Sequence, residues 1–412
     1  MKKILFCSSS IKTGKGGIAS YAQDFISLFK YEFSFIVVTS DNGTMNDSDI
    51  PVFQINMDDW SKKNAKQLLD IITKTSPDII INSSFSLLSI ISPFIPNNIK
   101  LITISHFTDG ILAKYAGLNG DYVDSMIGLS TFAKSFLNEY SCVKDSSKIK
   151  VVYNYMPVDK DADLLSKIHS SINIVYPGGT NYQKSADVVC KSILKLLKTD
   201  IDFKLYWIGN SNIVGHQYPF VHTKSLDDIL PRDNRIIKLG PVSREEAKNI
   251  LLNANIFVLP SRGEGFPISL IEAMRGYSIP VISNAKHGAL DLIKDKENGF
   301  IVKQDNAEDL YLCLVNILKN HFQYKCIYEN SYQTYKKYLT PEVWKSKMSE
   351  IFNEDDNHKK RVCFDGFPLL YWKGVIKLRY AIYKFKLFEI LIKHISMMLK
   401  FRYIRYVYRN VI

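Results

Sequence analysis

The sequence predicts an α/β protein of two doubly wound parallel-sheet domains, because β-rich segments alternate with helical patterns in two separate series. In residues 1–160 the strand-like segments are Ile4–Ser8, Phe33–Thr39, Ile79–Ile81 and Leu101–Ser105. The second series consists of Ile172–Tyr176, Phe203–Ile208, Ile236–Leu239, Ile256–Leu259 and Pro280–Ser283. A chain of 412 residues is also too long for one ordinary core and long enough for two.

A hinge is expected between the two series. Val151–Asp159 combines the end of a strand with the turn formers Asn154 and Pro157. We therefore expect Rossmann-like domains at residues 1–160 and 161–354, followed by a tail of different composition at 355–412. Ligands of such sheets bind at the carboxyl ends of the strands, so the cleft between the domains is the expected site.

Composition excludes several classes of protein. No run of 18 apolar residues appears, so we expect no membrane-spanning helix. The apolar stretch Ile4–Cys7 after Met1–Lys3 is too short for a signal peptide, which favours a cytoplasmic protein. The six cysteines form no C-x-x-C pair, so neither a disulfide framework nor a zinc site is expected. The pairs Asp58–Asp59 and Asp227–Asp228 do not follow apolar strands, and we expect no metal there.

Nearly all of the net charge of +12 lies in the tail. Residues 359–412 contain thirteen Lys or Arg and two acidic residues, a net charge of +11. Arg379, Lys386, Lys393 and Lys400 are seven apart and fall on one stripe of a helix, although apolar residues occupy most of the remaining circumference. The tail either lies on an anionic membrane surface or packs on the first domain, and its apolar excess argues against a nucleic-acid partner.

The strongest chemical signal is the run S-R-G-E-G-F-P-I-S-L-I-E-A-M at residues 261–274, directly after Ile256–Leu259. Pro267 suits the first turn of a helix, so Glu264 is expected on the loop and Glu272 inside the helix, with both carboxylates facing one cleft. Carboxylates accept hydrogen bonds from vicinal hydroxyls, and a helix start suits a diphosphate. The alternative is a capped helix with two solvated glutamates.

Three further features lie directly after strand-like segments. Gly16 and Gly17, in a glycine-rich run that opens a helix, allow close backbone approach to an anion, although a purely structural turn is an equal alternative. His106 follows Leu101–Ser105 and suits hydroxyl binding or local electrostatics better than proton abstraction. Lys184 lies eight residues after Tyr176, and by its position alone it could be a solvated lysine at a helix start.

The run at 261–274 resembles the signature of family 4 of the retaining glycosyltransferases, in which two glutamates separated by seven residues follow a Ser-Arg-x-Glu-Gly-Phe-Pro context. The resemblance continues through Ile279–Ser283, Gly288 and Asn298–Val302, and it covers residues 1 to about 350. It implies a GT-B architecture, a hexosyltransferase-type enzyme that retains the anomeric configuration, a nucleotide diphosphate sugar as donor, and no metal or other cofactor.

The resemblance also implies roles for particular residues. Glu264 would orient donor-sugar hydroxyls, Glu272 would bind the ribose, and Lys184 would neutralise the donor phosphates. The implied catalytic set is Glu264, Lys184 and His106, and the implied donor-binding set is Gly16, Gly17, Arg262, Gly265, Phe266, Pro267, Leu270 and Glu272.

Two positions depart from the family pattern. Gly179 stands where an arginine is expected, which removes one cation that Arg262, Asn181 or Lys15 would have to replace. Phe107 stands where an aspartate usually follows the histidine.

These features predict a retaining glycosyltransferase that moves a sugar from a nucleotide diphosphate sugar to a glycan or lipid-linked acceptor. Such a reaction belongs to surface-polysaccharide biosynthesis, of lipopolysaccharide or capsule, at the inner face of the cell membrane. One alternative is a nucleotide-sugar epimerase of the same fold, which the context of the two glutamates disfavours. The other is a non-catalytic membrane-associated binding protein, suggested by the basic tail and the missing arginine.

Overall fold

The computed structural model describes most of the two domains and the beginning of the tail. The described residues are 1–12, 17–45, 47–106, 116–156, 172–180, 182–210, 225–355, 360–362 and 371–375, with the single residues 164, 167, 366 and 377. The predicted boundary at residues 160 and 161 lies outside them, as do Gly16, Lys15, Phe107, Asn181 and the tail beyond residue 377.

The first domain is a parallel sheet of seven strands in the order β3-β2-β1-β4-β5-β6-β7. Alternating residues of β1 enter two separate apolar cores, Ile4 and Phe6 on one face of the sheet and Leu5 and Cys7 on the other. The first core includes α1, and the second includes α2 and α3. The strands are β1 (Lys2–Ser8), β2 (Phe33–Thr39), β3 (Val52–Gln54), β4 (Ile79–Ser83), β5 (Lys100–Ser105), β6 (Ser125–Gly128) and β7 (Ile149–Val151). The helices are α1 (Gly17–Phe29), α2 (Lys62–Thr75), α3 (Ser86–Ile91) and α5 (Thr131–Tyr140).

The second domain is a parallel sheet of six strands in the order β10-β9-β8-β11-β12-β13. Its central strand β11 is buried along its whole length, as expected for a sheet with helices on both faces. The strands are β8 (Asn173–Tyr176), β9 (Lys204–Ile208), β10 (Ile236–Gly240), β11 (Ile256–Leu259), β12 (Ile279–Ser283) and β13 (Phe300–Val302). The helices are α7 (Ala186–Leu196), α8 (Leu226–Ile229), α9 (Arg244–Leu252), α10 (Ile268–Arg275), α11 (Ala307–Asn320), α12 (Lys325–Tyr338) and α13 (Pro341–Asn353).

The two doubly wound parallel sheets confirm the predicted fold class, and the predicted strands all form. The two predicted series of strands missed β3, β6, β7 and β13. β3, β7 and β13 are three-residue strands at the sheet edges, so none of them carries a long apolar run. β6 has the sequence Ser-Met-Ile-Gly, whose polar first residue and terminal glycine weaken the strand pattern.

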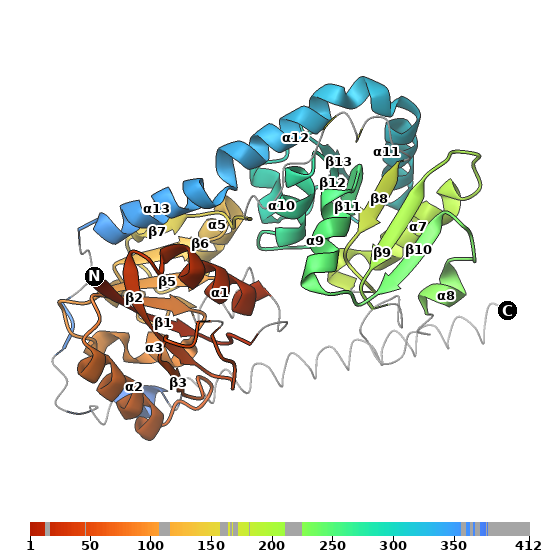
Figure 1. Cartoon of the computed structure of the whole chain (residues 1–412). Coiled ribbons are helices and arrows are strands. Elements are labelled where there is room, and N and C mark those ends of the chain that lie inside the picture. The colour runs from red at the N-terminus through yellow and green to blue at the C-terminus, as the bar shows by residue number, and fades with distance from the viewer. Residues whose placement is uncertain are drawn as a thin grey trace.

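Helix α13 returns to the first domain, although it lies within the predicted second domain of 161–354. Figure 1 shows α12 and α13 running along one side of the molecule from the second sheet back to the first. Trp344 is 2% exposed and packs 5.2 Å from Phe25 of α1 and 4.6 Å from Tyr155, centroid to centroid. Lys100 donates from Nζ to the carbonyl of Phe352 at 3.2 Å, and so satisfies a free carbonyl near the end of α13.

The beginning of the tail is built into the first domain. Arg361 has a fully buried guanidinium that binds the Asp124 carboxylate at 3.0 Å. The guanidinium also donates to the carbonyls of Pro96, Ile99 and Tyr122, at 2.7 to 3.0 Å. Further along, Trp372 is 4% exposed and belongs to the same core as α2 and α3. The described beginning of the tail therefore packs on the first domain. This agrees with the second of the two alternatives predicted for the tail, and not with a membrane surface.

Replacing Arg361 with methionine should destabilise the first domain by about 3–5 kcal/mol, because a buried Asp124 carboxylate would lose its cation. Urea unfolding of the variant, followed by tryptophan fluorescence, measures this loss. Lys360→Met is the matched control, since Lys360 is exposed beside Arg361 in the chain. Equal stability of the two variants would contradict a structural role for the buried ion pair.

Candidate active site

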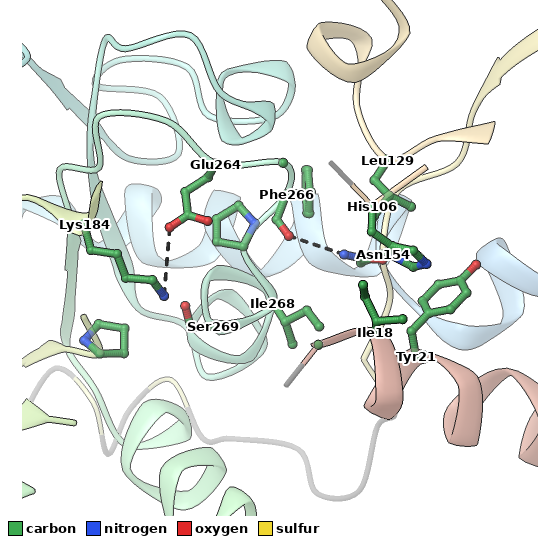
Figure 2. A pocket seen from close by; sticks show the side chains of 14 residues that line it. Ile18, Tyr21, His106, Leu129, Asn154, Lys184, Glu264, Phe266, Ile268 and Ser269 are labelled. Carbon is green, nitrogen blue, oxygen red and sulfur yellow. Dashed lines mark hydrogen bonds and ion pairs between the residues drawn. The ribbon is translucent and has the colours of Figure 1, made fainter. Parts of the chain in front are cut away.

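A cavity of about 410 Å³ lies between the two domains. Figure 2 shows its two walls, with Lys184 and Glu264 on the side of the second domain and His106 and Tyr21 on the side of the first. The first domain contributes Gly17, Ile18, Tyr21, His106, Leu129 and Asn154, and the second contributes Pro177, Lys184, Glu264, Gly265, Phe266, Pro267, Ile268 and Ser269. The expectation of a site in the cleft agrees with this geometry.

Glu264 lies on the loop between β11 and α10 and is oriented by two partners. Ser261 donates from Oγ to Glu264 Oε1 at 3.3 Å, and Lys184 Nζ lies 3.9 Å from the same oxygen. Ser283 fixes the loop from below by donating to the carbonyl of Ser261 at 2.5 Å. The Lys184 and Glu264 side chains remain 31% and 20% exposed, so both can reach a ligand in the cavity. The pair offers a cation and a hydrogen-bond acceptor side by side.

Two helix starts face the same cavity from opposite domains. Gly17 begins α1, and Pro267 precedes α10, whose N-terminus has no side-chain cap. Gly17 lies close to Ile268. A Cβ atom added at position 17 would be 4.0 Å from Cδ1 of Ile268. Free N–H groups and the helix dipole at such ends attract anions. The cavity therefore has two sources of partial positive charge besides Lys184.

His106 is a neutral member of the first-domain wall. Its Nε2 lies 2.9 Å from Ser83 Oγ, and its ring packs edge-on against Tyr21 at 4.8 Å between centroids. Burial lowers the pKa of His106 to about 4, so the imidazole carries no charge at neutral pH. It can exchange hydrogen bonds with a hydroxyl, but it adds no positive charge to the cavity.

Asn154 is a cavity residue that the sequence analysis treated only as a turn former. Its Nδ2 donates to the carbonyl of Phe266 at 3.3 Å, so it joins the first-domain wall to the motif loop of the second domain. Leu129 also lines the cavity and was not predicted as a site residue. Both follow strand ends, Leu129 after β6 and Asn154 after β7, and recognising those two short strands would have indicated them.

Three residues of the predicted donor-binding set lie away from the cavity lining. Arg262 makes two bonds of 2.9 Å to the Asp187 carboxylate and one of 2.6 Å to Asp305, so two acidic side chains already neutralise its guanidinium. Leu270 is fully buried in the core. Gly265, Phe266 and Pro267 do line the cavity, as does Gly17.

Glu272 is the third of these residues because its side chain is not among those that line this cavity, and its expected position facing the cleft stays a prediction. Its side chain lies inside α10 and is only 6% exposed. Burial raises the pKa of Glu272 to about 7, against the opposing effect of Arg244 and Lys248. Arg244 in turn binds Asp24 of α1 at 2.8 Å, so Glu272 lies behind an ion pair that crosses between the domains.

The backbone conformation at position 179 explains why a glycine stands there instead of the expected arginine. Gly179 has φ of +53°, and a Cβ there would lie 2.9 Å from the backbone nitrogen of Asn210. A side chain at position 179 is therefore strained whatever its charge. Since Arg262 is paired with two aspartates, it does not replace the missing cation, while Asn181 and Lys15 lie outside the described residues.

Nothing in the described part of the chain resembles a metal centre. Within it, no group of three or more His, Cys, Asp or Glu side chains is arranged to hold a metal ion. Likewise, no helix among the described residues is long and apolar enough to cross a membrane.

The two parallel-sheet domains with a cavity between them define the GT-B architecture. HepE from Anabaena, solved in complex with UDP and glucose, superimposes with a TM-score of 0.68 at 15% sequence identity, covering 85% of this chain and 99% of HepE. Residues 164–334 match the family model of the glycosyl transferases group 1. This match confirms the predicted recognition and the transferase class.

Two curated relatives show the same likeness. An uncharacterised glycosyltransferase of Haemophilus influenzae is 24% identical over 340 residues, covering 78% of this chain and 91% of the relative. An N,N'-diacetylbacillosaminyl-diphospho-undecaprenol α-1,3-N-acetylgalactosaminyltransferase of Campylobacter jejuni is 38% identical over 68 residues, or 16% of this chain and 18% of the relative. The chain spans only 57% of the length of another curated relative.

Replacing Glu272 with glutamine should stabilise the protein at pH 8 but not at pH 4.5. A pKa of about 7 in the folded state means that the folded protein keeps a proton that the unfolded chain releases between pH 4.5 and 7. Stability falls as the pH rises through this window and then stays lower, by up to about 3 kcal/mol, and glutamine removes this loss.

Thermal unfolding of the wild type and Glu272→Gln at both pH values measures the difference. The exposed Glu245, on the neighbouring helix α9, provides the control variant Glu245→Gln. If Glu272→Gln is less stable than the wild type at pH 8, Glu272 is instead a charged partner of Arg244 and Lys248.

Proposed function

We propose that the protein is a retaining glycosyltransferase that moves a hexosyl group from a nucleoside diphosphate sugar to a glycan or lipid-linked acceptor. The single observation that supports this most is the convergence of Lys184, Glu264 and two helix starts on one cavity between two parallel-sheet domains. UDP and glucose occupy HepE, which shares the fold. The Campylobacter relative is named for a lipid diphosphate acceptor, and this favours an acceptor of that class in surface-polysaccharide biosynthesis.

The cavity suits the electrostatic demand of sugar transfer, which is to stabilise the departing nucleoside diphosphate. Lys184 donates to the diphosphate, and the starts of α1 and α10 add their free N–H groups. Glu264 accepts hydrogen bonds from hydroxyls of the donor sugar, and neutral His106 exchanges another. These contacts need no arginine. Because a glycine stands at position 179, Lys184 must supply more of the positive charge that stabilises the departing diphosphate.

Transfer with retention requires no protein nucleophile in this proposal. The bond between the anomeric carbon and the donor phosphate oxygen breaks, and its electrons leave with the diphosphate. The acceptor hydroxyl oxygen attacks from the same face and forms the new glycosidic bond. Its proton passes to an oxygen of the departing diphosphate, so the products are the glycoside and a nucleoside diphosphate.

Lys184→Met should reduce donor turnover about 100-fold or more, because removing one donor that stabilises a departing anion costs a factor of about 10² to 10³. The assay is release of nucleoside diphosphate from a panel of UDP- and GDP-sugars, with and without a lipid-linked acceptor. Lys191→Met, on the exposed face of α7, is the control. Circular dichroism of both variants checks the fold.

Full activity of Lys184→Met would overturn the assignment of the site. NMR of the product reports the configuration at the anomeric carbon, and inversion would contradict the retaining mechanism. A panel sugar that is epimerised without release of nucleoside diphosphate would instead identify the epimerase alternative.

We also propose that residues 378–412 hold the enzyme on the inner face of an anionic membrane, where lipid-linked acceptors would be found. This segment contains eight Lys or Arg and one Glu, with Tyr380, Tyr403, Tyr406 and Tyr408 suited to the headgroup region. Each basic residue contributes about 1 kcal/mol at an anionic surface. Trp372, earlier in the tail, is buried in the first domain and takes no part in this proposal.

A chain that ends at Lys377 should lose binding to vesicles containing phosphatidylglycerol but keep its stability. Ending the chain at residue 377 preserves the buried Arg361 and Trp372, which an earlier truncation would remove. Co-sedimentation with phosphatidylglycerol and with pure phosphatidylcholine vesicles measures binding of both forms at low and high salt. Equal binding of the truncated form, or no binding of the full chain, contradicts the membrane proposal.

A further inference from the structure

The connection between β1 and α1 leads directly to the cavity. β1 ends at Ser8, and Gly17, the first residue of α1, lines the cavity. Residues 9–12 form neither helix nor strand, so no regular backbone ladder fixes them. The hydrogen bonds that hold this stem must come from elsewhere in the domain.

Two of them end on one carboxylate, that of Asp41, which lies two residues after the end of β2. Asp41 Oδ2 accepts a bond of 2.5 Å from Ser10 Oγ. Oδ1 accepts bonds from the backbone N–H of Ile11 at 3.4 Å, from Thr39 Oγ1 at 2.9 Å and from the N–H of Gly43 at 3.1 Å. A single side chain thus connects the stem after β1 to the turn after β2.

Two more contacts hold the same stem. Lys12 donates its backbone N–H to Ser10 Oγ at 3.3 Å, which extends the hold to the last described residue of the stem. Gln23 of α1 donates from Nε2 to the carbonyls of Ile11 at 2.9 Å and Thr44 at 3.1 Å. The stem, the turn after β2 and the first turns of α1 are therefore fixed relative to one another.

The turn and the stem are also packed without spare room. A Cβ at Gly43 would lie 2.7 Å from the backbone nitrogen of Lys12, so the two backbones are already in contact. Burial by itself would raise the pKa of Asp41, but the bonds from Ser10, Thr39, Gly43 and Ile11 outweigh it and hold the pKa below its ordinary value. The carboxylate is therefore charged at neutral pH, which makes each of these bonds stronger than its neutral counterpart.

We propose that Asp41 is a positioning residue for the sugar-transfer site. Through Ser10, Ile11 and Lys12 it fixes the stem that precedes the start of α1, and thereby the place of Gly17 at the cavity wall. This proposal rests on the proposed function, because the start of α1 matters for catalysis only if an anionic leaving group binds there. Asp41 is not among the residues that line the cavity, so its effect on the reaction is indirect.

The test compares Asp41→Asn with Asp47→Asn. Asp47 lies in the same β2–β3 connection, where it forms a half-exposed ion pair with Lys30 at 3.3 Å and accepts the backbone N–H of Asp49 at 3.3 Å, so it is a matched control. We expect Asp41→Asn to lower kcat for donor turnover ten- to hundredfold, since small displacements of groups around a reacting centre cost factors of about this size. Asp47→Asn should leave kcat unchanged.

A second measurement reports on the stem without any substrate. Hydrogen–deuterium exchange of peptides that cover residues 8–17 should be faster in Asp41→Asn and unchanged in Asp47→Asn. Ser10→Ala removes one of the four bonds and should shift both readouts in the same direction by less. Adding it to Asp41→Asn should cause little further loss of kcat, because both changes break the same contact.

The outcomes separate this proposal from the proposed function. Unchanged kcat and unchanged exchange in Asp41→Asn overturn the positioning role. If Asp41→Asn does not fold, Ser10→Ala decides instead, and wild-type kcat and exchange in that variant also overturn it. If the wild type turns over none of the panel donors while exchange at residues 8–17 still rises in Asp41→Asn, the hold on the stem is correct and the proposed function is wrong.

Discussion

The return of α13 to the first domain is the constraint on which the candidate site depends. Each wall of the cavity belongs to a separate sheet, and only segments that contact both sheets can set the distance between the walls. Burial of Trp344 beside Phe25 is worth roughly 3–5 kcal/mol, and Lys100 satisfies the end of the helix. By contrast, the ion pair between Asp24 and Arg244 is partly exposed and contributes at most about 1 kcal/mol. The helix therefore contributes more to the attachment of the two domains than this ion pair does.

The cavity achieves its electrostatic character with few full charges. Lys184 is balanced by Glu264 at 3.9 Å, His106 is neutral because it is buried, and Arg262 is neutralised by Asp187 and Asp305. What remains are the partial charges of two helix starts, which require that the backbone be held in place, since a dipole acts only over its first turn. This explains why so many interactions near the cavity fix the main chain: Ser283 on the motif loop, Asn154 on Phe266 and Asp41 on the stem before α1.

The sequence predicted the fold class and half of the residues that line the cavity, because both depend on local patterns. Strands with apolar runs were found, and Glu264, Lys184, His106 and Gly17 are in fact brought together. The burial of Glu272 could not be predicted, because it depends on how α10 packs against α9 and α1. The conformation at Gly179 could not be predicted either, because it depends on contact with Asn210, which follows β9. The hold of Asp41 on Ser10 likewise joins residues 31 apart that share no motif.

The tail shows why composition alone left two readings open. Trp372 fills the core beside α2 and α3, whereas the basic residues beyond 377 are suited to an anionic surface by their charge. Arg361 is one of the thirteen cations of the tail, yet it is fully buried, so it contributes to the stability of the domain and nothing to a surface charge. The cavity lies on the α1 side of the first sheet, while Trp372 packs on the opposite side. Residues 371–375 of the tail thus cover the face of the first sheet that is turned away from the cavity.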